Sequence, residues 1–500
     1  MSTRRLPMAT YPQAYISTRI MRSSVSMRLI RQLTKLMPRQ SLVRQQPIRQ
    51  MHQLSVNTSK PINIQSHATK LPTLAVGAYD DKYISVIING EHILQFSNIF
   101  LRDSCQAPDS VDPYSKQKLF TTAEISKNLR LNAPPFVKNG VLHVQWNQNG
   151  QIHNSEYTER FLKISSNTTS RRRGKNFELE KTFWNEKQLR AEFPALNVSY
   201  DEYMKDQDVF DHTVNNLNQY GIAFVNNIKN VQIDKKMSEE NAPSWPVAKL
   251  ASKFGYIKKT FYGSLFDVKN EKEAKNIANT SSFLPLHMDL LYYESPPGLQ
   301  LLHFIQNSTT GGENIFCDSF LAAEHVREVD PQAYFALTEV PITYHYDNNN
   351  EYYYFQRPLV VEGEVVDSRT NYPVIKEVNY SPPFQGPFEV GITKNNSFST
   401  SSNLDVLNTS AMENSSHFLF QDFIRGFQLF EDFINDPKNH FQIKSKENSC
   451  VIFDNRRVLH SRLQFSDANG GDRWLMGCYV DGDSFRSKLR VSHRKNLVKK

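Results

Sequence analysis

The stretch HMDLLYYESPPGLQLLHFIQNSTTGGENIFCDSF, residues 287–320, carries the clearest chemical signal in the chain and lies in a run of short strand-like segments. It opens on His287-Met288-Asp289. Residues two apart in a β-strand point to the same face, so an imidazole and a carboxylate are presented together. With one more His they would form the two-His, one-carboxylate triad that binds non-haem Fe(II) and leaves coordination positions open. Alone the pattern is weak, because such a pair is more often a structural hydrogen bond.

A second His and an Arg stand in matching contexts nearer the C-terminus. His460 ends the apolar run VIFDNRRVLH, and Arg473 opens the strand-like run RWLMGCYV. On neighbouring strands of a small barrel, both side chains can point inward. A guanidinium binds a carboxylate bidentately, as the distal carboxylate of 2-oxoglutarate would require. Together with His287 and Asp289, these residues predict a metal site beside an anion clamp, although each taken singly would more often be structural.

Patterns along the rest of the chain predict its domains and fold class. Residues 80–167 contain short alternating runs such as KYISVIING and predict a small β-rich N-terminal domain. Residues 180–495 begin with helical patterns, continue with short strands over 283–380 and 441–490, and include a helix near 414–435. Strands flanked by helices, without regular βαβ alternation, predict an α+β protein built on a β-barrel or jelly roll.

Several local features predict loops and a helix start. The Asn/Ser-rich stretches 347–356 and 395–417 are predicted to be mobile loop insertions in the larger domain. The basic segment 168–175 (TTSRRRGK) is predicted to be a linker or an exposed loop. Ser199 begins an S-x-x-E capping box and predicts the start of a helix.

The stretch 287–320 resembles the iron-binding segment of gamma-butyrobetaine dioxygenase and trimethyllysine dioxygenase, the hydroxylases of carnitine synthesis in the taurine dioxygenase-like superfamily. FDNRRVLHSR and RWLMGCYVDGD are similar to the distal-His and Arg segments of that family, and FLRDSC and HVQW to its small N-terminal domain. The resemblance runs from about residue 83 to 495, apart from the two insertions. It implies a double-stranded β-helix, Fe(II), 2-oxoglutarate, dioxygen, ascorbate and a homodimer. It also implies hydroxylation of a small amine-bearing acid, with release of succinate and carbon dioxide.

The same resemblance implies roles for individual residues. His287, Asp289 and His460 would be the iron ligands, and Arg473 would hold the co-substrate. The GGEN motif lacks the Lys and the following helix of a phosphate loop, so that interpretation is poor. In the resemblance it lies on a turn entering a core strand, from which Asn314 could approach the co-substrate.

Four residues fall at substrate-contact positions of the family, namely Tyr262, Phe266, Asn276 and Tyr479. Tyr262 and Tyr479 match rings of the aromatic cage that holds a trimethylammonium group, and Asn276 matches a contact to the substrate carboxylate. Phe266 stands where the family often has Trp. Ordinary core packing would account for Tyr262 and Tyr479 about equally well.

Two further cage positions depart from the butyrobetaine enzyme, because Asn279 and Leu290 stand where that enzyme has Tyr. A cation–π contact contributes roughly 0.5–2 kcal/mol. Loss of two rings therefore predicts weaker binding of a quaternary ammonium group.

Other departures concern the N-terminal domain and the distal-His segment. The animal enzymes hold a structural zinc with three closely spaced Cys and a His, whereas here only Cys105 and His153 match. Two ligands cannot complete a tetrahedral site, so no zinc is predicted. Cys317, Cys450 and Cys478 lie in apolar runs and are predicted to be reduced core residues. Arg456 replaces the Trp of the family's FDNWR block, a change that the sequence does not explain.

The net charge of +8 is not evenly distributed. Residues 1–79 contain nine Arg, three Lys and no acidic residue, which leaves the remaining 47 basic and 51 acidic residues with a net charge of −4. The N-terminal composition, with an amphipathic pattern near residues 17–37, predicts a mitochondrial transit peptide over 1–50, a linker over 51–79 and a location in the matrix. A disordered basic arm that binds RNA is the alternative, but no aromatic-interleaved basic stripe supports a nucleic-acid partner. No apolar run is long enough for a membrane span.

Three hypotheses follow. The first is a mitochondrial Fe(II)/2-oxoglutarate dioxygenase acting on a small amine-bearing acid. The second keeps that chemistry with a non-carnitine or protein substrate, as the altered cage suggests. The third is a non-catalytic mitochondrial maintenance protein that retains the fold.

Overall fold

The computed structural model describes residues 73–176, 181–229, 234–269, 279–348, 350–367, 369–388, 403–466, 468 and 470–498. The chain divides into the units Met1–Lys70 and Leu71–Lys500, and all of the described residues belong to the second unit. The predicted transit peptide, and the predicted linker up to residue 72, lie outside the described residues.

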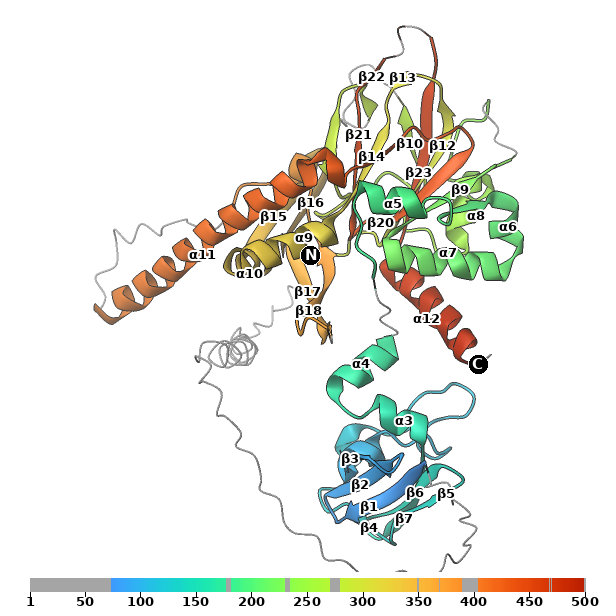
Figure 1. The fold of residues 1–500 in the computed structure, drawn as a ribbon, viewed down its shortest axis with the longest axis vertical. Coiled ribbons are helices and arrows are strands. Elements are labelled where there is room, and N and C mark those ends of the chain that lie inside the picture. Colours follow the sequence, from blue (N-terminus) through green and yellow to red (C-terminus); the bar gives the residue numbers. More distant parts are fainter. Residues whose placement is uncertain are drawn as a thin grey trace, which may run out of the picture. The chain divides into compact units, whose positions relative to one another are not determined.

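The first part of the described chain is β-rich, as expected (Figure 1). It contains two antiparallel sheets, with orders β1-β2-β3 and β4-β6-β5, and β7 pairs with β6. Alternate residues of β2 and β6 point inward and pack around Trp146. The elements are β1 Leu74–Tyr79, β2 Tyr83–Ile88, β3 His92–Ser97, α2 Asn98–Asp103, β4 Arg130–Leu131, β5 Phe136–Lys138, β6 Val141–Gln148, β7 Gln151–Thr158, α3 Glu159–Ile164 and α4 Thr168–Asn176.

Two predictions for this part were wrong. Strand β1 lies within the predicted linker 51–79, because Leu74 is buried against the β-rich core. The predicted loop at 168–175 is helical in α4. A polar composition excludes a buried helix but does not exclude an exposed one.

The larger part contains two antiparallel sheets, apart from one parallel pair, and these form the expected jelly roll. The six-stranded sheet has the order β10-β23-β12-β20-β9-β8, and the four-stranded sheet has the order β11-β21-β14-β19. The first consists of β10 Phe266–Lys269, β23 Arg473–Val480, β12 Leu299–Asn307, β20 Ser449–Asp454, β9 Ile222–Asn226 and β8 Asn197–Ser199. The second consists of β11 Leu284–His287, β21 Val458–Arg462, β14 Asn314–Asp318 and β19 Phe441–Ile443.

Strand β12 is almost wholly buried because both of its faces are covered. Leu302 and Phe304 face inward and share a core with Phe316 of the opposite sheet. Leu299 and Leu301 face outward into a second core, beneath the helices drawn beside β9 and β20 in Figure 1. The helices on this side are α6 Tyr200–Lys205, α7 Gln207–Tyr220, α8 Pro246–Ser252 and α12 Gly482–Val498, whereas α5 Glu186–Glu192 contacts β19 and contributes Leu189 to the inner core. Ser199 caps α6, as predicted, by accepting a hydrogen bond from the Glu202 amide.

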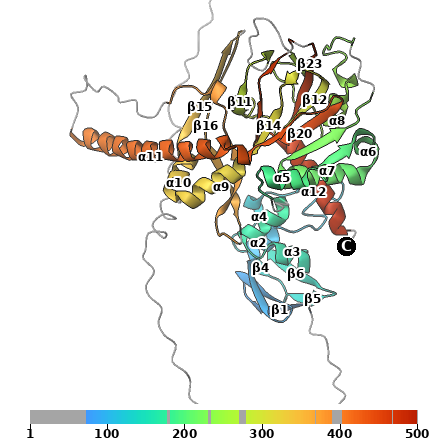
Figure 2. The same cartoon turned by 45° about the horizontal axis from the view of Figure 1, so that its top comes forward.

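Helices also cover the outer side of the four-stranded sheet. Figure 2 shows α11 Asn403–Asn435 running along α9 Ser319–Val329 and α10 Pro331–Glu339. The predicted mobile loop 395–417 is therefore helical from residue 403 onward. None of the helices in the described ranges is long and apolar enough to cross a membrane.

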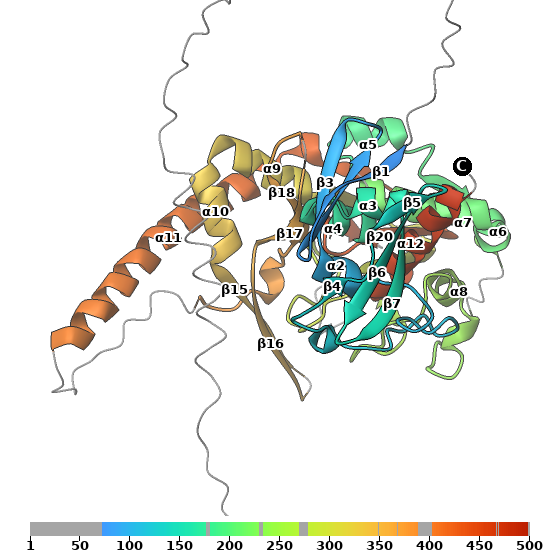
Figure 3. The same cartoon turned by 90° about the horizontal axis from the view of Figure 1, so that it is seen from below.

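Two hairpins extend from this side. Strands β15 Pro341–Asn348 and β16 Glu351–Pro358 form the ribbon seen in Figure 3, and β17 Val360–Val366 pairs with β18 Pro373–Val378. The predicted mobile loop 347–356 is therefore wrong, because its residues form most of β16 and pair back onto β15. A short ladder, β13 Thr310–Gly311 with β22 Phe465–Ser466, lies before β14. The predicted GGEN turn, residues 311–314, leads from this ladder into β14, and its Gly311 and Gly312 adopt positive φ angles.

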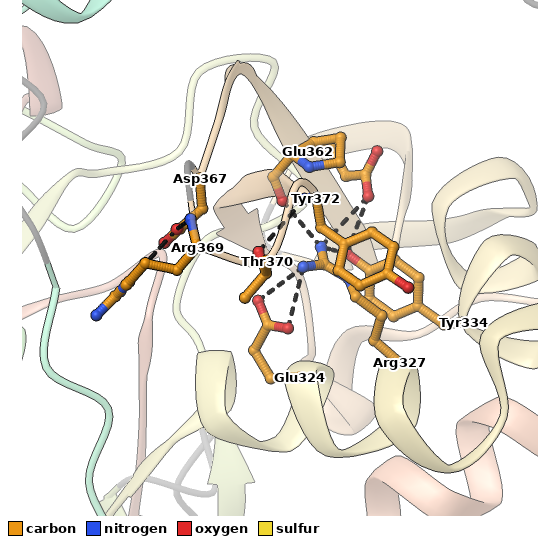
Figure 4. A network of polar contacts seen from close by, with 9 residues as sticks. Glu324, Arg327, Tyr334, Glu362, Asp367, Arg369, Thr370 and Tyr372 are labelled. Carbon is orange, nitrogen blue, oxygen red and sulfur yellow. Dashed lines mark hydrogen bonds and ion pairs between the residues drawn. The ribbon is translucent and has the colours of Figure 1, made fainter. Parts of the chain in front are cut away.

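A buried polar network ties α9 to the β17–β18 hairpin (Figure 4). The Arg327 guanidinium donates to both oxygens of Glu324 at 2.8 and 3.0 Å, to Glu362 at 3.3 Å and to the hydroxyl of Tyr334. Two carboxylates thus offset the charge of one buried guanidinium, so this network has a structural role.

Candidate active site

The two predicted histidine ligands come from paired strands. β11 runs antiparallel to β21, and this register sets His287 directly opposite His460. Their ring centroids are 4.1 Å apart, and both side chains are buried. The ring of His460 also packs 4.9 Å from Phe453 of the facing sheet. The sheet ladder therefore fixes both imidazoles at the inner surface of the barrel.

Asp289 completes the group from just beyond the end of β11. Its Oδ1 lies 3.3 Å from Nε2 of His287 and 4.0 Å from Nε2 of His460. Within the described residues, these three form the one group of His, Cys, Asp or Glu side chains close enough to share a metal ion, with ligand atoms within 4.8 Å of one another. The structure thus brings together the three residues that the sequence singled out.

The electrostatics of the group favour the protonation states that a metal requires. Burial alone would raise the pKa of Asp289, but the hydrogen bond from His287 and the charge of His460 outweigh it and hold that pKa below its usual range. Burial, together with the neighbouring His287, lowers the pKa of His460 to about 3. Nδ1 of His287 lies 2.8 Å from the carbonyl of Pro285 and donates to it, which orients the ring so that Nε2 faces Asp289. The group thus presents an ionised carboxylate and a neutral His460 beside the ring of His287.

Arg473 lies one layer further along the barrel. His460 and Arg462 occupy the same face of β21, two residues or about 7 Å apart along the strand. Arg462 and Arg473 approach the ring of Phe465 to 5.1 and 5.3 Å, so the two guanidiniums are neighbours. Burial and this second guanidinium lower the pKa of Arg473 to about 9. Lys444 adds a third cation to this layer. Burial lowers its pKa, and the nearby charge of Arg473 lowers it further.

This end of the barrel contains polar groups that the protein itself does not satisfy. Arg473 is 8% exposed, forms no ion pair with any described carboxylate, and its Nε has no hydrogen-bond partner. The Oδ1 of Asn314 and the hydroxyl of Thr309 are likewise buried without partners. Asn314 is paired with Arg462 across β14 and β21, which puts it in the same layer. Buried polar atoms normally have partners, so this cluster fits a polar, anionic ligand.

A cavity of about 100 Å³ opens beside the triad, lined by His287 and Asp289. Three of the predicted substrate residues, Tyr262, Phe266 and Tyr479, also line it. Phe266 and Tyr479 stack with centroids 4.9 Å apart, and the Tyr479 hydroxyl donates to Oδ2 of Asp289 at 2.8 Å. Gly477 makes room for this wall, because a Cβ there would lie 2.2 Å from the ring of Phe266.

The expectation of a cage thinned by two rings stays a prediction, but the cavity has other rings in its walls. Asn279 and Leu290 do line the cavity, but so do the rings of Tyr292 and Phe384, which pack 5.1 Å apart. Phe384 ends the 3₁₀ turn Pro382–Phe384, almost a hundred residues beyond the triad's first ligand in sequence. Five rings therefore surround the cavity. Asn276 lies outside the described residues.

Sequence reasoning missed several residues of the site. Arg462, two residues after His460 on the same strand face, had a local signal in that spacing. Lys444 and Phe384 had none, because their proximity arises only from the tertiary fold. Tyr292 belongs to the quoted opening stretch, but it lies beyond the end of β11, where strand periodicity no longer indicates direction.

The N-terminal residues Cys105 and His153 also come together, with Sγ 3.3 Å from Nε2. The other ring nitrogen of His153 lies 2.8 Å from Asp109, and Ser110 lies 3.3 Å from Nε2. The absence of zinc stays a prediction. Cys105, Cys317, Cys450 and Cys478 are buried free thiols, and the last three lie in core strands as predicted.

The jelly roll, the His-Asp-His group at its inner surface and the cationic layer beside it are the features of a 2-oxoglutarate-dependent oxygenase. The sequence model described as "Taurine catabolism dioxygenase TauD, TfdA family" matches residues 185–479, and the chain belongs to that family. It is therefore an oxidoreductase of the Fe(II)- and 2-oxoglutarate-dependent class, and the predicted family resemblance is confirmed.

Relatives match most of the chain. The probable oxidoreductase AIM17 of Saccharomyces cerevisiae is 34% identical over 421 residues, which cover 80% of this chain and 85% of the relative. Dioxygenase str8 of Strobilurus tenacellus is 32% identical, over 81% and 87% of the two chains. Gamma-butyrobetaine dioxygenase of a Pseudomonas species is 26% identical, over 82% and 94%.

Proposed function

We propose that His287, Asp289 and His460 hold Fe(II) and that Arg473 holds the distal carboxylate of 2-oxoglutarate, in an enzyme that hydroxylates a small amine-bearing acid. The observation that carries the proposal is the pairing of a compact His-Asp-His group with a buried guanidinium that has no carboxylate partner among the described side chains. Two imidazoles and one carboxylate are the donor set of non-haem Fe(II) sites with open coordination positions.

Each part of the site has a task in this reaction. Bound iron supplies the activation of dioxygen, in which 2-oxoglutarate becomes succinate and carbon dioxide while one oxygen atom enters the substrate. Arg473 and Asn314 orient the co-substrate from the far end, and the two-residue separation of Arg462 from His460 along β21 suits the length of a five-carbon diacid. Tyr479 holds Oδ2 of Asp289 and so leaves Oδ1 facing the imidazoles.

The walls of the cavity support a substrate with an amine or ammonium head. Tyr and Phe faces attract a cation at roughly 0.5–2 kcal/mol per contact. Asp267 adds a carboxylate to the lining, and among the described lining residues none is Lys or Arg. An ammonium group would therefore meet aromatic faces and the carboxylates of Asp267 and Asp289 in this cavity.

The second candidate keeps the chemistry but changes the substrate to one outside the carnitine pathway. Two observations favour it. Asn279 and Leu290 line the cavity at positions where the resemblance has rings, and Tyr292 and Phe384 contribute rings to the same cavity. The chain is also more similar to AIM17 and str8, at 34% and 32% identity, than to the butyrobetaine enzyme at 26%.

Aerobic turnover tests the proposal. Purified protein with Fe(II), ascorbate and 2-oxoglutarate should form succinate, and the His287→Ala variant should form none. His143→Ala is the matched control, since this His lies on β6 of the N-terminal region beside Glu156. Failure of the wild-type protein to bind both iron and 2-oxoglutarate would refute the proposal. Turnover of butyrobetaine and trimethyllysine against a panel of other amines separates the two candidates.

We also propose import into the mitochondrial matrix, on the acid-free, Arg-rich composition of residues 1–79. A fluorescent protein fused behind this segment should enter mitochondria. Replacement of Arg28, Arg31 and Lys35 by Glu should leave it in the cytosol, whereas replacement by other basic residues should not.

A further inference from the structure

The carboxylate ligand stands on backbone that the sheet does not hold. Strand β11 ends at His287, so Asp289 lies outside its ladder. The next residue, Leu290, has a φ of 58°, a left-handed conformation that a branched residue adopts only when its surroundings enforce it. The position of the Asp289 carboxylate must therefore be set by contacts other than strand pairing.

The Tyr479 hydroxyl contacts the carboxylate itself, and the side-chain amide of Asn455 holds the backbone of Asp289. The Oδ1 of Asn455 accepts from the backbone N–H of Asp289 at 2.9 Å, and its Nδ2 donates to the backbone carbonyl of the same residue at 2.9 Å. The two bonds therefore hold the backbone on both sides of the Asp289 Cα, from which the carboxylate side chain extends. Nδ2 also lies 3.4 Å from the carbonyl of Pro297, and Asn455 is fully buried. One amide thus fixes the backbone direction of one metal-ligand candidate.

The residue after Asn455, Arg456, fixes the loop that carries the Asn455 side chain. The Arg456 guanidinium donates to Glu377 at 2.7 Å and to Asn379 at 2.5 Å, while its carbonyl accepts from the Val378 amide at 2.9 Å. These bonds tie the loop after β20 to β18. They also give a physical reason for an Arg where the resemblance has a Trp, because the half-buried carboxylate of Glu377 and the buried amide of Asn379 accept hydrogen bonds from its guanidinium.

The segment that Arg456 holds also returns to the triad. The backbone carbonyl of Tyr380, the residue after Asn379, accepts a hydrogen bond from the Met288 amide at 2.9 Å. Met288 and Asp289 are therefore supported from two neighbouring segments, directly by Asn455 and through the Arg456 contacts. His287 and His460 have no such need, since their strands pair with each other.

We propose that Asn455 is a positioning residue that keeps the Asp289 carboxylate facing His287 and His460, and so sets the affinity of the site for its metal. This inference rests on the proposed role of the three residues as metal ligands. Partners behind a metal ligand typically change metal affinity by about 10–100-fold when they are removed. We expect Asn455→Ala to weaken metal binding by that factor.

A residue that merely supports the fold could give the same loss, so the test compares two backgrounds. Ni(II), which binds imidazole well, is titrated calorimetrically into the apo protein. In the wild-type background Asn455→Ala should weaken binding about 10–100-fold. In the Asp289→Ala background it should change the remaining two-His affinity by less than about 2-fold, the usual error of additivity. An equal loss in both backgrounds, or no loss in either, would overturn the proposal.

A second variant covers the case in which Asn455→Ala does not fold. Asn455→Asp has nearly the same shape and keeps the acceptor for the Asp289 amide, but it turns an oxygen toward the Asp289 carbonyl. It should also weaken Ni(II) binding only while Asp289 is present. Asn216→Ala, which removes a buried side-chain donor to the Ala195 carbonyl, is the matched control and should leave Ni(II) affinity unchanged.

The two proposals fail in different ways. If the wild-type protein binds no Ni(II), or if Asp289→Ala binds it as tightly as wild type, the metal site itself is wrong. If Asp289→Ala weakens binding and Asn455→Ala does not, the site stands and the positioning role of Asn455 is wrong.

Discussion

Arg457 and Arg473 are two buried arginines of the same jelly roll, and their surroundings are opposite. Arg457 has both oxygens of Asp318 at 3.0 and 2.8 Å and two backbone carbonyls as further acceptors. Arg473 forms no ion pair with a described carboxylate, its Nε has no hydrogen-bond partner, and burial and the charge of Arg462 lower its pKa. A buried charge is costly unless it is paired, so the second arrangement persists only if something else offsets it.

This difference indicates that Arg457 stabilises the fold and that Arg473 binds a ligand. Asp318 and two backbone carbonyls accept four hydrogen bonds from the Arg457 guanidinium. Arg473, with the unpaired Asn314 and Thr309 beside it, leaves its hydrogen-bonding capacity open toward the barrel interior. An organic anion that reaches from the triad to this layer would satisfy it, which is the place given to 2-oxoglutarate in the proposed function.

The largest effect is expected from breaking the satisfied pair. Arg457→Met leaves the Asp318 carboxylate buried without its cation, and loss of one partner of a buried pair costs about 3–5 kcal/mol of the free energy of unfolding. Urea denaturation measures this loss. Asp318→Asn combined with Arg457→Met should recover part of it, and a loss below about 1 kcal/mol for Arg457→Met alone would contradict the structural role.

The same substitution at Arg473 should affect ligand binding rather than the free energy of unfolding. Arg473→Met should weaken 2-oxoglutarate binding by roughly 100- to 1,000-fold, about 3–4 kcal/mol, because the distal carboxylate loses its partner. The free energy of unfolding of the apo protein should stay the same or rise, since an unpaired buried charge disappears. Calorimetry and urea denaturation measure the two quantities. Arg473→Lys, which keeps the charge without the fork, should fall between. A marked loss of apo stability with intact binding would reverse the assignment.

His303 is a buried polar group that faces the core rather than the site, and it should make the free energy of unfolding depend on pH. His303 on β12 is fully buried, neither ring nitrogen has a partner, and burial lowers its pKa to about 4. The unfolded chain takes up this proton near pH 6.5, so the stability that the neutral ring contributes is complete above that pH. It should fall by at most about 3 kcal/mol as the pH drops toward 4. His303→Leu should flatten the acid limb of urea midpoints between pH 7 and 4, compared with the wild-type protein.

The smallest effect is expected at the substrate end of the site. Phe384→Ala removes one ring from the cavity wall and should lower kcat/KM for the substrate identified by the amine panel by about 2- to 30-fold, the worth of one cation–π contact. The KM for 2-oxoglutarate should not change, since Arg473 lies in the other layer. Equal effects on both ligands would mean that the two ends of the site are not independent.

The sequence alone predicted what depends on local periodicity. His287 and Asp289 share a short motif, and His460 and Arg473 lie in apolar runs, so sequence spacing was enough to group them. The strand argument itself was wrong for Asp289, which lies beyond the end of β11, and β21 and β23 belong to different sheets. The Asn455 clamp, the Phe384 ring and the cation of Lys444 arise where distant segments meet, and nothing in their own neighbourhoods indicates this.

Composition misled in two places for a related reason. The Asn-rich stretch 347–356 forms a strand because a partner strand satisfies its backbone. The Ser-rich stretch before residue 418 continues a helix whose later residues are buried, including Phe423 and Phe430. Packing at one end of an element can thus override weak propensity at the other.

Binding of 2-oxoglutarate tests the central claim most directly. The full chain, loaded with Fe(II) under anaerobic conditions, is titrated calorimetrically with 2-oxoglutarate, alongside the His287→Ala protein. One molecule should bind per chain, and metal removal or loss of His287 should weaken the binding strongly, because the co-substrate is expected to bridge the triad and the Arg473 layer. Binding that is absent in the wild-type protein, or equally tight without metal, would contradict the account.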